Sequence, residues 1–131
     1  LDVSINVQRE WKADLMKIGT LYELVVDEML PAQKMGWHLD QLKSDKVEYN
    51  KEAAQPIEEI NRKYSELLSR VRSLYYEASG WIGPLTGDQK AQFEYFNAVL
   101  PKLKQETNQV LKSDIPKLNR GLSKENRYSQ Q

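Results

Sequence analysis

The chain contains no cysteine and only one histidine, His38. Without cysteine it has no disulfide framework, no thiolate nucleophile and no cysteine metal site. A single histidine supplies too few ligands for a zinc site, and a di-iron helical bundle would need Glu-x-x-His motifs that the sequence lacks. The sequence therefore predicts no metal and no cofactor, and it gives His38 a structural or solvent-exposed role.

A net charge and a long apolar run are also missing. The 19 Lys and Arg residues balance 19 Asp and Glu residues, so the formal net charge is zero. Because nucleic-acid and membrane-surface binding both rely on a net basic face, we expect neither partner. No run of about 18 apolar residues is present, so we expect no membrane insertion. The seven basic residues within 102–127 are interpreted as a solvated helical face followed by a frayed tail.

Catalytic motifs are absent as well. The sequence has no glycine-rich phosphate loop, no nucleophile elbow and no kinase signature. Its adjacent carboxylates, Asp27–Glu28 and Glu58–Glu59, would diverge on a helix and stay solvated, because neighbouring residues point to different sides. No catalytic residue is predicted.

What the sequence has is long apolar stripes in steps of three and four, which indicate helices buried along one face. With 131 residues, 40% of them hydrophobic and 29% charged, the chain is expected to form one folded domain rather than a disordered segment. The stripes predict helices at about 7–43, 51–79 and 87–120 within a bundle over 7–122. The expected class is all-α, an antiparallel up-down-up three-helix bundle with long, proline-kinked helices.

The stripe of the first helix runs through Pro31 in unbroken register, which favours a kink over two separate helices. The stripe positions are Val7, Trp11, Leu15, Ile18, Tyr22, Val25, Met29, Ala32, Met35, Leu39 and Leu42, then Ala53, Ile57, Ile60, Tyr64, Leu67, Val71, Leu74 and Ala78, then Gln89, Phe93, Phe96, Leu100, Leu103, Thr107, Val110, Leu111, Ile115, Leu118 and Leu122.

Helix ends are marked by capping residues. Ser4 or Asn6 is expected to cap the first helix and Asn50 the second. Residues 80–89 form a corner in which two glycines and a proline stop one helix, and Thr86 and Gln89 have capping-box spacing for the next. Its apolar residues Trp81, Ile82 and Leu85 are expected to seal one end of the bundle.

The ends of the chain are predicted to lie outside the bundle. Residues 1–6 alternate apolar and polar side chains and are interpreted as a lead-in from a preceding module. Residues 123–131 are interpreted as a polar tail that follows the ordered part. The chain starts at Leu1 without methionine or signal peptide, so we expect a piece of a longer, processed protein.

Aromatic residues divide into two groups. Those on the stripes are predicted to lie in the core: Trp11, Tyr22, Tyr64, Tyr75, Phe93 and Phe96. Trp37, Tyr76 and Trp81 fall off the stripes or in the corner, and they form the candidate docking surface for a neighbouring domain. Trp81 has a second interpretation as a plug of the bundle end, and carbohydrate stacking on these rings is not distinguished from packing.

Two segments resemble a known family. Residues 82–89 read Ile-Gly-Pro-Leu-Thr-Gly-Asp-Gln, and residues 114–119 read Asp-Ile-Pro-Lys-Leu-Asn. They resemble the C-terminal helical region of bacterial BNR-repeat, sortilin-like β-propeller proteins, often labelled putative glycosyl hydrolases, although here Leu85 stands between the proline and the threonine. The resemblance covers about residues 1–122.

The resemblance implies a non-catalytic helical accessory domain with a scaffolding or docking role in a larger, secreted bacterial protein. Its partner would be a neighbouring β-propeller domain of the same chain, in the periplasm or outside the cell. Any hydrolase activity would belong to that propeller. The alternative is a standalone helical protein–protein interaction module, and a weaker third reading is a small enzyme or carbohydrate binder.

Overall fold

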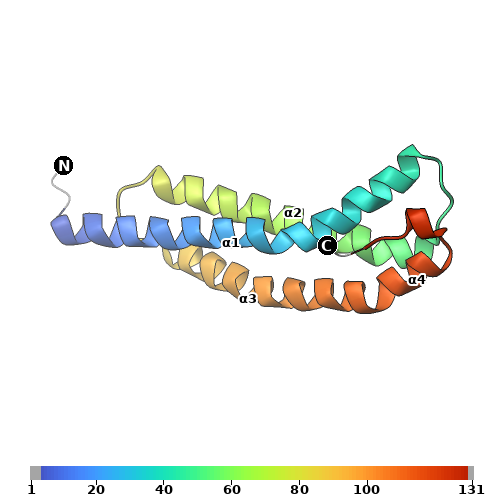
Figure 1. Cartoon of the computed structure of the whole chain (residues 1–131). Helices are drawn as coiled ribbons and strands as arrows, with labels where there is room; N and C mark the ends of the chain where they lie inside the picture. The colour runs from blue at the N-terminus through green and yellow to red at the C-terminus, as the bar shows by residue number, and fades with distance from the viewer. Residues whose placement is uncertain (1–3, 130–131) are drawn as a thin grey trace. The chain divides into compact units, whose positions relative to one another are not determined.

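In the computed structural model, which describes residues 4–129, the described chain is an all-helical bundle without strands (Figure 1). Three long helices account for most of it, and the third continues through a π-helical turn into a short helix. A 3₁₀ turn follows near the C-terminus. The elements are α1 (Ile5–Ser44), α2 (Lys51–Ser79), α3 (Gly87–Gln109), the π-helix η1 (Val110–Asp114), α4 (Ile115–Arg120) and the 3₁₀-helix η2 (Lys124–Asn126).

The chain divides into two compact units where the sequence predicts one bundle. Unit 1 comprises Ser65–Pro101 and the described residues up to Asp27, and unit 2 comprises Glu28–Tyr64 and the described residues from Lys102 onward. The three long helices therefore each contribute residues to both units. The features below are described unit by unit.

The first helix begins at its expected cap. Ser4 Oγ accepts a hydrogen bond from the Val7 N–H at 3.2 Å, so Ser4 rather than Asn6 caps α1. The helix thus starts at Ile5, and the last two residues of the expected lead-in are helical; residues 1–3 lie outside the described part. Along α1 the stripe from Ile18 onward is buried, apart from the half-buried Tyr22.

The second helix matches its stripe most closely. The sequence places it at 51–79, and α2 runs Lys51–Ser79. Asn50 Oδ1 accepts hydrogen bonds from the N–H groups of Glu52 at 3.0 Å and Ala53 at 3.2 Å, which satisfies two of the unpaired donors of the first turn. All eight stripe residues, from Ala53 to Ala78, are buried.

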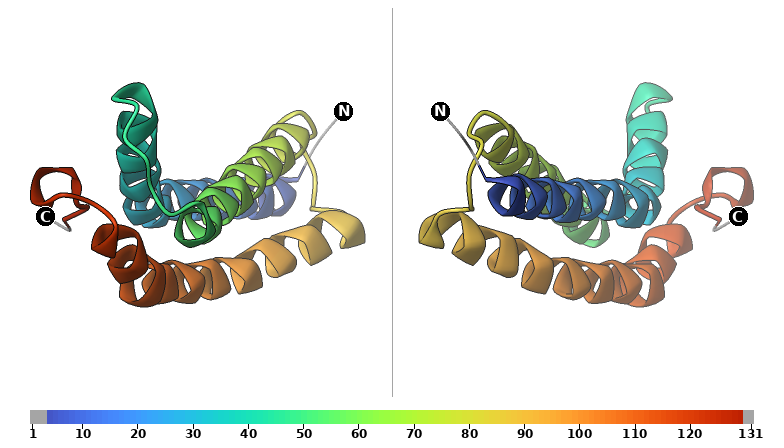
Figure 2. Two further views of the ribbon diagram at one scale, coloured as in Figure 1. Left: turned by 90° about the vertical axis from the view of Figure 1, so that its right-hand side faces the viewer. Right: turned by 90° about the vertical axis from the view of Figure 1, so that its left-hand side faces the viewer.

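The corner after α2 is built as its residues predict. The Thr86 hydroxyl accepts from the Gln89 N–H at 3.1 Å, and the Gln89 side-chain oxygen accepts from the Thr86 N–H at 3.0 Å. This reciprocal capping box starts α3 at Gly87. Figure 2 shows this connection crossing from the end of α2 to α3 in unit 1, and the Asp45–Asn50 connection leading from α1 to α2 in unit 2.

The third helix changes its winding before Pro116. The Ile115 N–H donates to the Val110 carbonyl, an i→i+5 bond that defines η1. Pro116 then occupies the first turn of α4, where its missing N–H costs no helical hydrogen bond. The Asp114 side chain makes no capping bond before α4, and the π-turn η1 bridges the two helices instead.

The predicted aromatic core is correct except at one position. Tyr64 and Phe96 are buried, and Trp11, Tyr22 and Phe93 are half-buried. Tyr75 is 37% exposed, so its placement in the core is wrong. Its ring lies over Gly19 of α1, with Cε2 3.6 Å from the position that a Cβ would occupy there. A residue without a side chain lets the tyrosine ring rest on the helix surface in unit 1.

Candidate functional site

The three candidate docking residues all expose their aromatic rings. Trp37 is 57% exposed in unit 2, and Tyr76 and Trp81 are 66% and 69% exposed in unit 1. Trp37 follows Gly36 on α1, where the stripe residues on either side, Met35 and Leu39, are buried. Tyr76 lies next to Tyr75 on α2, and their rings contact edge to face at 6.2 Å.

Trp81 does not plug the bundle end. Its indole lies against the backbone of Gly83, with Nε1 only 2.8 Å from where a Cβ of that residue would stand. Gly83 is thereby buried, while Trp81 and Ile82 remain exposed. Leu85 is the corner residue that turns inward, and it lines a small hollow of unit 1 with Ile18 and Phe93. The expected seal is therefore wrong for Trp81 and Ile82, because a glycine lets the indole fold back on its own loop.

Other exposed apolar side chains were not among the docking candidates. Met16 and Ile5 on α1 are 72% and 68% exposed, and Tyr95 on α3 is 60% exposed. Met16 and Tyr95 lie between stripe positions, and Ile5 precedes the first of them. The off-stripe position that marks Trp37 and Tyr76 therefore applies equally to Met16 and Tyr95.

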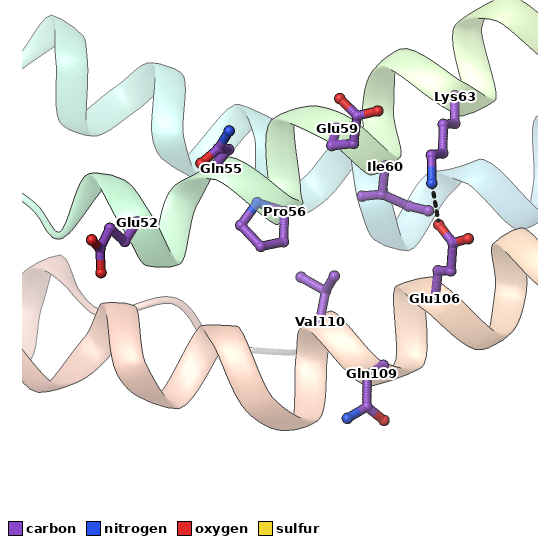
Figure 3. Close-up of a pocket in the computed structure, with 9 residues that line it drawn as sticks. All are labelled: Glu52, Gln55, Pro56, Glu59, Ile60, Lys63, Glu106, Gln109 and Val110. Carbon is purple, nitrogen blue, oxygen red and sulfur yellow. Dashed lines mark hydrogen bonds and ion pairs between the residues drawn. The ribbon is translucent and has the colours of Figure 1, made fainter.

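The most clearly formed hollow of unit 2 is an open groove between α2 and α3 (Figure 3). Its volume is about 480 Å³. Pro56 and Val110 face each other across it, and Glu59 and Gln109 point away from it. The lining residues are Glu52, Gln55, Pro56, Glu59, Ile60, Lys63, Glu106, Gln109 and Val110.

Two of the three carboxylates that line this groove are engaged by basic side chains. Glu106 Oε2 accepts from Lys63 Nζ at 3.0 Å, and Glu59 pairs with Arg62 on its own helix. The hydrogen bond from Arg62 lowers the pKa of Glu59, which keeps this carboxylate ionised and unsuited to act as an acid. The third carboxylate, Glu52, lies in the first turn of α2.

Among the described residues no group of three or more His, Cys, Asp and Glu side chains is placed to hold a metal ion. His38 is half-buried in unit 2, and its ring meets that of Tyr128 at 5.4 Å. This contact gives His38 a structural role. No helix in residues 4–129 has the length and apolarity needed to cross a membrane.

Comparisons with family models, with curated proteins and with solved structures found no match to this chain. The relationship to the propeller-associated helical region therefore depends on the two sequence segments described above.

Proposed function

We propose that this chain is a non-catalytic helical accessory domain that docks against a β-propeller in a larger, secreted bacterial protein of the BNR-repeat, sortilin-like type. The observation that carries the proposal is the exposure of three large aromatic side chains, Trp37, Tyr76 and Trp81. Large aromatic residues are enriched in the buried centres of protein interfaces, where they contribute much of the binding energy. The localisation that follows is the periplasm or the extracellular space.

Contacts within each unit support an antiparallel up-down-up order of the three helices. In unit 1, Trp11 Nε1 donates to the Ala78 carbonyl at 2.8 Å, and further along α1 the Tyr22 hydroxyl accepts from Arg72 at 3.0 Å. The residue number rises on α1 as it falls on α2. In unit 2, Lys63 pairs with Glu106, while the earlier Pro56 faces the later Val110. The same opposition therefore holds for α2 and α3.

Kinks at the prolines complete the proposed architecture. Pro31 has no N–H to donate, so the carbonyl of Asp27 loses its helical partner. The division between units falls immediately after Asp27 in α1 and immediately after Pro101 in α3. A kink at each proline would account for both positions.

A non-catalytic role agrees with the groove chemistry of unit 2. Glu59 and Glu106 are paired with basic residues, which leaves Glu52 as the third carboxylate of the lining. A glycosidase needs two carboxyl groups flanking one bond. We expect the purified chain to show no turnover on aryl glycosides, and hydrolysis at enzyme-like rates would contradict the proposal.

The coding sequence upstream of the Leu1 codon tests the family assignment. A β-propeller encoded in frame directly before this codon is the expected result. A different upstream module, or a start codon at this point, would contradict it and would favour the standalone interaction module.

A further inference from the structure

We propose that residues 121–129, here called the C-terminal strap, form a pH-operated latch that docks beside His38 when its imidazole is neutral and releases when it is protonated. The sequence predicts a frayed tail here, but the strap makes specific contacts with α4 and α1. The latch lies entirely in unit 2, and it does not depend on the proposed docking function.

Asn119 of α4 holds the backbone of the strap at Tyr128. The Asn119 side chain accepts from the Tyr128 N–H at 2.8 Å and donates to the Tyr128 carbonyl at 3.0 Å. Arg127 Nε donates to the carbonyls of Asn119 at 3.2 Å and Leu122 at 3.1 Å, which satisfies acceptors left free at the end of α4. The strap is therefore folded back on the end of α4.

The side chain of the same residue, Tyr128, lies against α1. The Tyr128 ring meets the His38 ring at 5.4 Å with an interplanar angle of 70°, an edge-to-face arrangement. Tyr128 also packs against the buried cluster of unit 2, which includes Met35, Leu39 and Leu122. The backbone of Asn126 hydrogen-bonds the imidazole. His38 is thus the polar side chain on which the strap closes.

The second nitrogen of the imidazole makes this contact sensitive to protonation. His38 Nε2 is buried and has no hydrogen-bond partner among the described residues. Neutral imidazole tolerates one bare nitrogen, but imidazolium carries an N–H on both nitrogens. Protonation would leave a charged donor buried without an acceptor, a state that swinging the strap away into solvent relieves.

Burial lowers the pKa of His38, and the hydrogen bond with Asn126 offsets part of that effect. The docked form therefore binds a proton less tightly than the released form. Docking is strongest above the ordinary histidine pKa of 6.5 and weakens as the pH falls from there to the pKa of the docked state. Below that second value both forms are protonated, and the docking equilibrium stops changing.

Charged groups on the surrounding elements do not replace the missing acceptor. The carboxylates closest in sequence to the contact, Asp40 and Glu125, are exposed on α1 and on the strap. Half-buried Tyr49 packs on the same cluster from the connection after α1. Further charged side chains of these elements are also exposed: Lys34 on α1, Glu48 in the connection, Lys117 and Arg120 on α4, and Lys124 and Arg127 on the strap.

The single histidine makes a direct test practical, because one imidazole C2–H proton resonance reports its titration. In the intact chain the pKa of His38 should lie below 6.5. The pKa of His38 should rise toward the ordinary value in Tyr128→Ala and in a chain ending at Leu122. The rise should be the same in these two variants. Tyr95→Ala removes an exposed tyrosine from unit 1 and should leave the pKa of His38 unchanged. An unchanged pKa in both strap variants would overturn the proposal.

Hydrogen exchange of the Tyr128 amide, corrected for its intrinsic pH dependence, tests the latch itself. Its protection should fall tenfold for each pH unit that separates the docked and released pKa values of His38. In His38→Gln, which cannot titrate, the remaining protection should not vary over the same pH range. Equal pH dependence in His38→Gln, or protection that is independent of pH in the unmodified chain, would overturn the latch.

Discussion

Asn61 of α2 donates its side-chain amide to the carbonyl of Ala32 on α1 at 2.8 Å, and to the Ile57 carbonyl of its own helix at 2.9 Å. One half-buried amide therefore joins two helices of unit 2. Gly36, one turn beyond Ala32, makes room for it. A Cβ at Gly36 would lie 3.2 Å from Asn61 Nδ2, closer than an unstrained contact. The hydrogen-bonded amide and the glycine thus form a matched pair.

Replacing Gly36 with alanine tests this pairing. In an open helix position the change would stabilise the protein by about 0.5–1 kcal/mol, because glycine loses more backbone entropy on folding. Here we expect net destabilisation of about 1 kcal/mol, since Asn61 can move away only by stretching its two hydrogen bonds. Urea denaturation followed by circular dichroism measures the change.

Gly19→Ala is the matched control for Gly36→Ala. A Cβ at Gly19 would meet the Tyr75 ring at 3.6 Å, an ordinary van der Waals contact. This variant should therefore gain the helix-propensity benefit of about 0.5–1 kcal/mol. Stabilisation of similar size in both variants would show that Asn61 imposes no constraint on Gly36.

Removing the α3 cap should cost a predictable amount. Thr86→Ala deletes the hydroxyl that accepts the Gln89 N–H, and the expected loss of unfolding free energy is about 1 kcal/mol. Thr20→Ala, at an exposed position inside α1, is the control and should change stability by less than about 0.5 kcal/mol. Thermal unfolding measures the stability of both variants. An unchanged stability in Thr86→Ala would mean that the cap does not stabilise the folded protein.

Removing the polar oxygen atom of Tyr64 should stabilise the folded protein. Its hydroxyl is buried and has no hydrogen-bond partner among the described residues, and the nearby Thr107 hydroxyl donates its own proton to the Leu103 carbonyl. Tyr64→Phe keeps the ring and removes the unpaired oxygen, so we expect stabilisation of about 1 kcal/mol. Tyr22→Phe loses only the exposed contact with Arg72 and should stay within about 0.5 kcal/mol of the unmodified chain. Destabilisation by Tyr64→Phe would indicate that the Tyr64 hydroxyl has a partner in solution.

The same residue predicts a pH dependence in alkaline solution. Burial raises the pKa of Tyr64 above the ordinary 10.0, with a small opposing effect from Thr107. The folded state therefore disfavours the phenolate, and stability falls as the pH rises from 10.0 toward the folded-state pKa. The slope of unfolding free energy against pH in this range should be shallower in Tyr64→Phe. An identical slope in the two proteins would contradict this assignment.

The helical stripes were predictable because spacing of three and four reports which side of a helix meets other apolar residues. In α2 the stripe from Ala53 to Ala78 is buried throughout, and the third stripe continues beyond α3 to the buried Leu122 after α4. Capping chemistry was equally local. Asn50 and the Thr86–Gln89 pair needed only their neighbours in sequence to form the expected bonds.

Features that depend on a single tertiary contact were not predicted from the sequence. Tyr75 lies beside the apolar stripe of α2, yet its ring rests over Gly19 at the surface. Trp81 has the composition of a buried plug, but Gly83 gives its ring a place on the loop itself. The strap is mostly polar, and its sequence pattern does not predict the hydrogen bonds between Asn119 and Tyr128. Each depends on one non-periodic contact that hydrophobic patterning does not encode.

We propose that Trp37 in unit 2 and Tyr76 and Trp81 in unit 1 each contact a β-propeller of the same protein. The most direct measurement is isothermal titration of this chain with the propeller encoded before it, expressed separately. Alanine substitution of each of the three residues should weaken binding at least tenfold, the loss of about 1.4 kcal/mol or more that marks an important interface residue, without changing the unfolding free energy. Tyr95→Ala, which removes another exposed aromatic ring, should bind as the unmodified chain does. Undiminished binding by all three variants, or no binding by the unmodified chain, would contradict the account.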